Sequence, residues 1–144
     1  MDNDKEIKQK YFSIVVSALA AQGWKQALDE NGRCAWMSET AHWGGETGAR
    51  RCAIGHLLPL DVIKRYQDES MMQTVESAID YKLLPSDLLE IDLKERNTRE
   101  EYVATQRFTG IMQTIHDDCD TPEGMEKAFK DFGQRLELTW PLPT

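Results

Sequence analysis

The sequence predicts an α+β fold that is mostly helical, with a small two-stranded antiparallel ribbon packed on a bundle of about five or six helices. Three observations lead to this prediction. Several segments carry apolar residues at helical spacing, two short apolar runs flank a polar, glycine-rich stretch, and 144 residues suffice for one core. We therefore expect a single domain over residues 1–144, in which residues 139–144 form a short C-terminal tail.

The first helix is expected near Asp4 to Gln22, where apolar residues recur at helical spacing, and Gly23 is a plausible stop. A second helix begins at Leu58-Pro59, because proline is favoured at the first helical position. Further short helices are expected over Met71–Ile79 and from Ser86 onward, where leucines recur.

The last two helices carry the clearest signals. Thr98 and Glu101 match a capping box, so the sequence predicts one helix from there to about Asp118. Thr121 is then the expected N-cap of the final helix, with Pro122 at its first position. Only a few residues join the two helices, which predicts an antiparallel pair.

The ribbon is expected from two short apolar runs, Cys34–Met37 and Cys52–Gly55. The residues between them are polar and rich in glycine, and they are too many for a tight turn. This connection is therefore expected to be an exposed loop and a natural surface for a ligand or partner.

Composition limits the classes of function. The chain has 17 basic and 25 acidic residues and a net charge of −8, which argues against nucleic acid held by bulk electrostatics. The charge suits either a basic protein partner or plain solubility. No run approaches the roughly 20 apolar residues that span a bilayer, and the acid-containing N-terminus is unlike a secretory signal. We therefore expect a helical, acidic protein of the cytoplasm with no membrane contact.

Cysteine and histidine form the first candidate site. The residues are Cys34, Cys52, His56 and His116, which together offer enough sulfur and nitrogen ligands for a tetrahedral zinc ion. Cys119 lies three residues after His116, so the two side chains can share a helix face. Their spacing matches no standard zinc pattern, and the cysteines equally suit buried packing positions. Zinc is accordingly the one cofactor considered, and none is otherwise expected.

A cysteine nucleophile is the second hypothesis, with Cys52 and His116 as the candidate catalytic residues and Cys34 as an alternative thiol. A histidine can activate a thiol, and a carboxylate can orient that histidine. Adjacent residues on a helix point about 100° apart, so Asp117 is expected to be poorly placed to orient His116. The alternative is that the histidine makes hydrogen bonds inside the domain.

The glycine-rich loop is the third candidate. Trp43, Arg50 and Arg51 combine an aromatic plane with two guanidinium groups, which suits a phosphate or a nucleotide. The loop lacks the Gly-Lys-Ser/Thr ending of a Walker A motif, and its glycines follow no strand-to-helix step of a dinucleotide fold. The alternative is a flexible connection with two exposed arginines.

The chain resembles a group of small bacterial and phage-encoded proteins of unknown function. The matching residues are Cys34 with Trp36, the glycines between Gly44 and Gly48, the Cys52–Gly55 run and the His116-Asp117 pair. No activity can be carried over from that group. The resemblance implies that Cys34, Cys52 and His116 form one unit, and that the chain derives from a phage or another mobile element.

The sequence contains no complete catalytic constellation, which favours a binding module over an enzyme. We expect a small acidic module that engages a protein partner, as an accessory or inhibitor protein of a phage or mobile element. The alternative is a ligand-, nucleotide- or zinc-binding protein that uses the cysteine and histidine residues with the arginine loop, including a cysteine-dependent enzyme.

Overall fold

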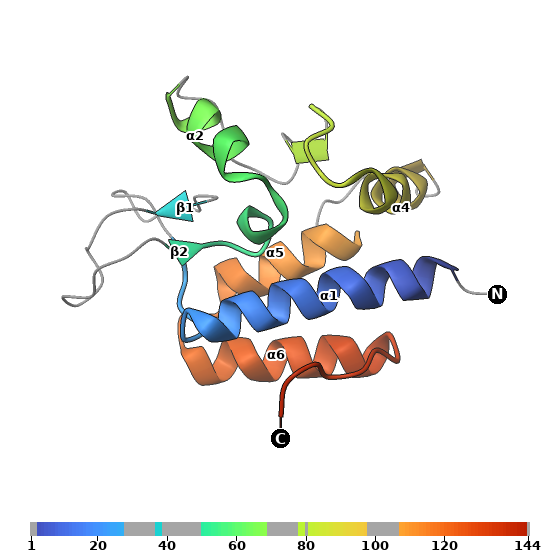
Figure 1. Ribbon diagram of the computed structural model, residues 1–144. Coiled ribbons are helices and arrows are strands. Elements are labelled where there is room, and N and C mark those ends of the chain that lie inside the picture. The colour runs from blue at the N-terminus through green and yellow to red at the C-terminus, as the bar shows by residue number, and fades with distance from the viewer. Residues whose placement is uncertain are drawn as a thin grey trace.

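Helices make up most of the part of the chain that the structure describes (Figure 1). The structure is a computed structural model, and it describes residues 3–27, 37–38, 50–68, 78–79, 81–97 and 107–143. The α-helices within these residues are α1 (Asn3–Ala21), α2 (Leu60–Asp68), α4 (Ser86–Asn97), α5 (Phe108–Asp118) and α6 (Pro122–Arg135). A 3-10 turn, η1 (Gly55–Leu57), precedes α2.

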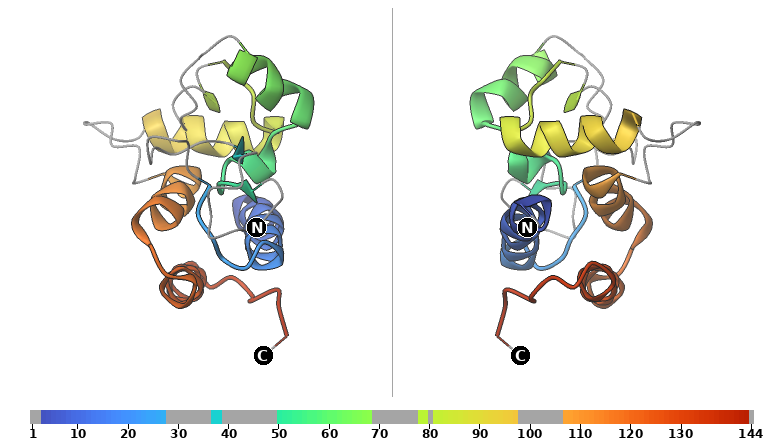
Figure 2. Two further views of the ribbon diagram at one scale, coloured as in Figure 1. Left: turned by 90° about the vertical axis from the view of Figure 1, so that its left-hand side faces the viewer. Right: turned by 90° about the vertical axis from the view of Figure 1, so that its right-hand side faces the viewer.

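Three of the helices lie side by side and form the base of the molecule. The views in Figure 2 look along α1, α5 and α6, while α4 runs across them and α2 lies farther out. Helix α1 contacts η1, α4 and α6, and α5 contacts α4 and α6. The hydroxyl of Tyr11 on α1 donates a hydrogen bond of 2.6 Å to Asp87 in the first turn of α4. Helix α1 therefore joins η1 and α4 to α6.

The expected α+β class with a packed two-stranded ribbon is wrong. The strands that the structure describes are β1 (Met37–Ser38) and β2 (Arg50–Arg51), and each has only two residues. Of the predicted strand Cys52–Gly55, Ala53 and Ile54 form a turn, and Gly55 begins η1. A short apolar run is compatible with any buried backbone, so it does not distinguish a strand from a buried turn. Cys34 to Trp36 of the other predicted strand lie outside the described residues.

The buried apolar side chains form one continuous cluster between the helices. Its aromatic part joins α1 to α6: Phe12 lies 6.3 Å from Phe132, measured between ring centroids. Gly133 is required there, because a Cβ atom at this position would lie 2.7 Å from the Cζ atom of Phe12. Close approach of α6 to the Phe12 ring thus fixes how the two helices pack.

The end of α1 confirms Gly23 as the stop. Gly23 has φ of 76° and Trp24 has φ of 58°, so the chain leaves the helix through the left-handed region. The backbone N–H of Trp24 donates to the carbonyl of Leu19 over 2.8 Å, which closes the turn. The strained backbone at Trp24 is held in place because its ring is buried and stacks on Trp140, with the planes 10° apart.

The predicted helix from Thr98 to Asp118 is not continuous, because the backbone is extended at Arg107. Arg107 has φ −88° and ψ 157°, so α5 begins at Phe108. Burial explains the break, because Arg107 is fully buried with its charge acting on the carboxylate of Asp92. Residues 98–106, including the predicted capping box, lie outside the described residues.

The final helix begins as predicted. The Oγ1 atom of Thr121 accepts a hydrogen bond of 3.1 Å from the backbone N–H of Gly124, and Pro122 is the first helical residue. The predicted helices near Leu58 and Ser86 are also present, as α2 and α4. Most of the helix expected over Met71–Ile79 lies outside the described residues, although Ala78 and Ile79 are helical. No helix among the described residues combines the length and the apolar character that crossing a membrane requires.

Candidate functional site

His116 lies at the end of α5 and is fully buried. Its Nε2 atom accepts a hydrogen bond of 2.9 Å from the backbone N–H of Ala27. This nitrogen therefore carries a lone pair, and the ring proton resides on Nδ1. Nδ1 donates in turn to Oδ1 of Asp117 over 2.9 Å. Both ring nitrogens are occupied by contacts inside the protein.

The expectation that Asp117 is poorly placed to orient His116 is wrong. The backbones of adjacent helical residues diverge by about 100°, but the last turn of a helix lets the short Asp117 side chain fold back to the ring. Oδ1 of Asp117 also accepts a hydrogen bond of 2.8 Å from the amide of Gln113. The carboxylate thus holds the imidazole in one orientation and one tautomer.

Gln113 extends this network to the turn that contains Cys52. Its Oε1 atom accepts a hydrogen bond of 3.0 Å from the backbone N–H of Ile54. A continuous path of hydrogen bonds therefore runs from Ile54 through Gln113 and Asp117 to His116 and on to Ala27. We call these groups the polar junction, because they join the end of α5 to the segment after α1 and to the turn before η1.

Two glutamines near the end of α1 complete the polar junction. The amide of Gln26 donates to the carbonyls of His116 and Asp117, over 3.0 and 2.9 Å, and so satisfies two acceptors at the end of α5. Gln22 binds the backbone of Arg51 through both amide atoms, accepting over 3.1 Å and donating over 2.7 Å. These contacts fix β2 and η1 against α1.

His56 borders the polar junction on η1. Its Nε2 atom lies 3.0 Å from Oε1 of Gln22 and donates to it. Burial lowers the pKa of His56 from 6.5 to about 4, and the nearby charge of Arg51 adds to the effect. The imidazole of His56 is therefore neutral at physiological pH.

The thiols differ in their surroundings. Cys52 is fully buried, and its sulfur accepts a hydrogen bond of 3.3 Å from the backbone N–H of Gly55. Cys119 is partly buried against the core, and burial raises the pKa of its thiol, as do the charges of Asp118 and Asp120. A raised pKa lowers the thiolate fraction and with it the reactivity of Cys119. Cys34 lies outside the described residues.

The structure brings together only some of the residues of the predicted zinc and cysteine sites. Cys52, His56 and His116 all border the polar junction, but no three His, Cys, Asp or Glu residues within the described ranges form a group that could hold a metal ion. The bonds of His116 to Ala27 and Asp117 would have to break before either nitrogen could bind a metal. A zinc set that includes Cys34, and a role for Cys52 and His116 in catalysis, stay predictions.

The predicted ligand-binding loop falls largely outside the described residues. Trp43 is among those not described, and of Arg50 the structure gives the backbone pairing with Ser38. Arg51 pairs with Met37 and is held by Gln22 through its backbone. Nucleotide binding by this loop also stays a prediction.

An exposed group of carboxylates follows the polar junction where α5 turns into α6. Its members are Asp117, Asp118, Asp120 and Glu123, which we call the acidic turn. Asp118, Asp120 and Glu123 form no ion pair with another residue that the structure describes. The acidic turn therefore presents negative charge to the solvent.

The glutamines are the site residues that sequence reasoning missed. Gln22, Gln26 and Gln113 make most of the side-chain bonds that join the segments of the polar junction. A glutamine in a helix is common and has no spacing rule, so nothing in the sequence distinguishes these from exposed ones. Comparison of the chain with protein-family models, with curated proteins and with solved structures finds no match.

Proposed function

We propose that this chain is a small acidic binding module that engages a basic surface of a protein partner. The observation that carries the proposal is the acidic turn, in which Asp118, Asp120 and Glu123 are exposed and form no ion pair with another described residue. The net charge of −8 supports a basic partner, since it disfavours an acidic one. A role as an accessory or inhibitor protein of a phage or mobile element fits such a module.

The position of the acidic turn supports a role in binding. Asp117 and Asp118 occupy the last turn of α5, where the helix dipole is negative. Carboxylates at that end lower stability by about 0.3–1 kcal/mol each, because like charges repel. Asp117 is compensated by its bonds to His116 and Gln113, whereas Asp118 is exposed. Side chains that lower stability without a structural reward are often kept for function.

The polar junction supports binding rather than thiol chemistry. Cys52 is buried beneath the turn before η1, and both nitrogens of His116 are engaged. A nucleophile and its base need access to a substrate and a bond to each other. The contacts of His116 instead stabilise the end of α5, from which the acidic turn projects.

Affinity capture from lysate with charge variants tests the proposal. The test variant neutralises three carboxylates by Asp118→Asn, Asp120→Asn and Glu123→Gln, and it leaves Asp117 in place to orient His116. We expect recovery of a basic partner to fall about tenfold. Each of the three exposed charges contributes modestly to the binding free energy, and their contributions add. Raising the salt from about 0.05 M to about 0.5 M should weaken capture by the original chain as well, since screening shortens the reach of the charges.

A matched control distinguishes the effect of the acidic turn from the effect of net charge. The variant Glu6→Gln, Asp61→Asn and Glu90→Gln removes three exposed carboxylates from α1, α2 and α4, and it has the same net charge as the test variant. Capture by this control should equal that of the original chain. Equal loss in both variants, or capture that salt does not affect, would contradict binding through the acidic turn.

A further inference from the structure

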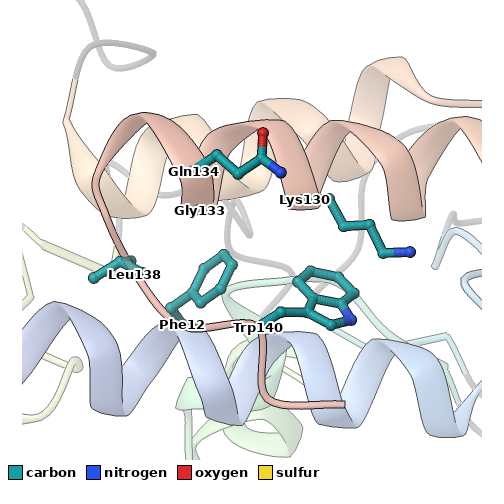
Figure 3. A pocket seen from close by; sticks show the side chains of 6 residues that line it. All are labelled: Phe12, Lys130, Gly133, Gln134, Leu138 and Trp140. Atoms are coloured by element: carbon teal, nitrogen blue, oxygen red, sulfur yellow. The ribbon is translucent and has the colours of Figure 1, made fainter. Parts of the chain in front are cut away.

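A cavity of about 230 Å³ lies between α6, α1 and the segment that follows α6 (Figure 3). It is lined by Phe12, Lys130, Gly133, Gln134, Leu138 and Trp140. We propose that this cavity is a binding site for a small aromatic carboxylate, with the ring packed against Phe12 and Trp140 and the carboxylate at Lys130. The site is separate from the acidic turn and adds a small-molecule ligand to the proposed function.

The walls of the cavity suit a flat ring. Phe12 and Trp140 meet edge to face, with 6.2 Å between their centroids and 63° between their planes. Aromatic rings favour such geometry, and a guest ring extends it. Apolar cavities of about 150 Å³ stay dry and bind benzene, so this one has room for one or two fused rings.

The cavity is a fixed feature, because three sets of contacts hold its walls. Gln9 binds the backbone of Thr139 through both amide atoms, accepting over 2.7 Å and donating over 3.0 Å. Trp140 stacks on Trp24 with 6.1 Å between centroids. A Cβ atom at position 133 would lie 2.7 Å from Cζ of Phe12, so the Phe12 ring packs directly against the backbone of α6. A ligand would therefore meet a site that is already formed, which reduces the entropy lost on binding.

Lys130 gives the cavity its preference for an anion. Figure 3 shows its side chain extending along the Trp140 side of the cavity, and its Nζ atom lies 5.3 Å from the centroid of that ring. The ammonium group is half-exposed and sits 3.4 Å from Oε2 of Glu126. A ligand carboxylate would compete with Glu126 for it. The amide of Gln134, one turn along α6, is a further donor beside the cavity.

Titration with 2-naphthoate and with its neutral analogue 2-naphthamide tests the proposal, by calorimetry and by amide chemical shifts. We expect saturable binding of 2-naphthoate with a dissociation constant on the order of 10⁻⁴–10⁻³ M, and weaker binding of the amide. The shifts should concentrate at Phe12, Gly133 and Trp140. No saturable shift at these residues overturns the proposal.

Charge variants on α6 assign the role of Lys130. Lys130→Gln should weaken 2-naphthoate binding about threefold and leave 2-naphthamide unchanged, since a half-exposed ion pair contributes modestly. Glu126→Gln should strengthen 2-naphthoate binding about twofold by removing the competing carboxylate. Lys127→Gln is the matched control, because Lys127 is exposed on the same helix and does not line the cavity.

Filling the cavity gives an independent check. Leu138→Phe should abolish binding of both compounds, because the larger side chain occupies the space of the ring. Should this variant fail to fold, the Lys130 and Glu126 variants decide. Equal binding of 2-naphthoate by the Lys130→Gln, Glu126→Gln and Lys127→Gln variants overturns the assignment of the anion to Lys130.

Discussion

Asp92, which is buried, has a raised pKa, whereas His56, which is half-buried, has a lowered pKa. Burial raises the pKa of Asp92 from 3.8 to about 6, although a hydrogen bond of 2.5 Å from Thr109 and the charge of Arg107 oppose the rise. Burial lowers the pKa of His56 from 6.5 to about 4. Both groups are therefore most stable in the fold when neutral. Their effects on stability run in opposite directions over the same pH range.

Asp92→Asn should stabilise the protein increasingly as the pH rises from about 4 to about 6. In this window the folded state binds more protons than the unfolded state at Asp92, so the free energy of unfolding of the original chain falls as the pH rises. The asparagine stays neutral and still accepts from Thr109. The gain should reach roughly 2–3 kcal/mol above pH 6. Urea denaturation across the window measures it, and a pH-independent difference would contradict a raised pKa at Asp92.

His56→Gln should stabilise the protein increasingly as the pH falls from about 6.5 to about 4. Here the unfolded state binds more protons than the folded state, so His56 makes the original chain less stable as the pH falls. Glutamine places an amide nitrogen where Nε2 donates to Gln22 and does not titrate. Urea denaturation is again the measurement. A difference that grows toward high pH instead would show that His56 is charged in the fold.

The glutamines mark the limit of prediction at the residue scale. The sequence identified His116, Asp117 and Cys52 as residues of interest, and the structure places them at or beside one polar junction. Gln22, Gln26 and Gln113, which make the connecting bonds, were not predicted, because their partners are backbone groups distant in sequence. Only the folded chain shows which glutamines are satisfied by such partners.

At the scale of elements, the turn between α5 and α6 joins a destabilised helix end to a stabilised helix start. Thr121 caps α6 well, and Glu123 in the first turn suits the helix dipole. Asp118 at the end of α5 opposes it. Asp118→Asn should therefore raise the free energy of unfolding by about 0.5 kcal/mol, and under the proposed function it also weakens capture of the proposed partner. Thermal and urea denaturation measure the first effect, and a loss of stability would contradict the dipole argument.

Helices with side-chain caps or a proline at the start were predictable from the sequence. The backbone conformation of the Cys52–Gly55 run, predicted as a strand of a ribbon, was not. Thr121-Pro122 and Gly23 act through local geometry that the sequence states directly. The Cys52–Gly55 run is buried against α1 and α5 by contacts distant in sequence, so its apolar character gave no information on backbone type. Arg107 ended the predicted long helix for the same reason, because its burial depends on the fold.

At the scale of the whole molecule, the apolar core and the polar junction hold different elements together. The core orders α1 against α6 through Phe12, Phe132 and the Trp24–Trp140 stack. The polar junction fixes the end of α5 and the turn before η1. The resemblance implied that Cys34, Cys52 and His116 form one unit, with a chemical or a structural role. In the structure the hydrogen bonds of Cys52 and His116 are made to backbone groups and Asp117.

The rate at which Cys52 reacts with iodoacetamide in the native protein, followed by peptide mass spectrometry, tests the structural role of the polar junction most directly. A fully buried sulfur reacts only when the fold opens, so we expect labelling at least about 10³-fold slower than in a model peptide. Peptide mapping distinguishes the labelling of Cys52 from that of Cys34 and Cys119. Labelling of native Cys52 at the rate of the peptide or faster would show an accessible, reactive thiol at Cys52, and it would contradict a purely structural junction.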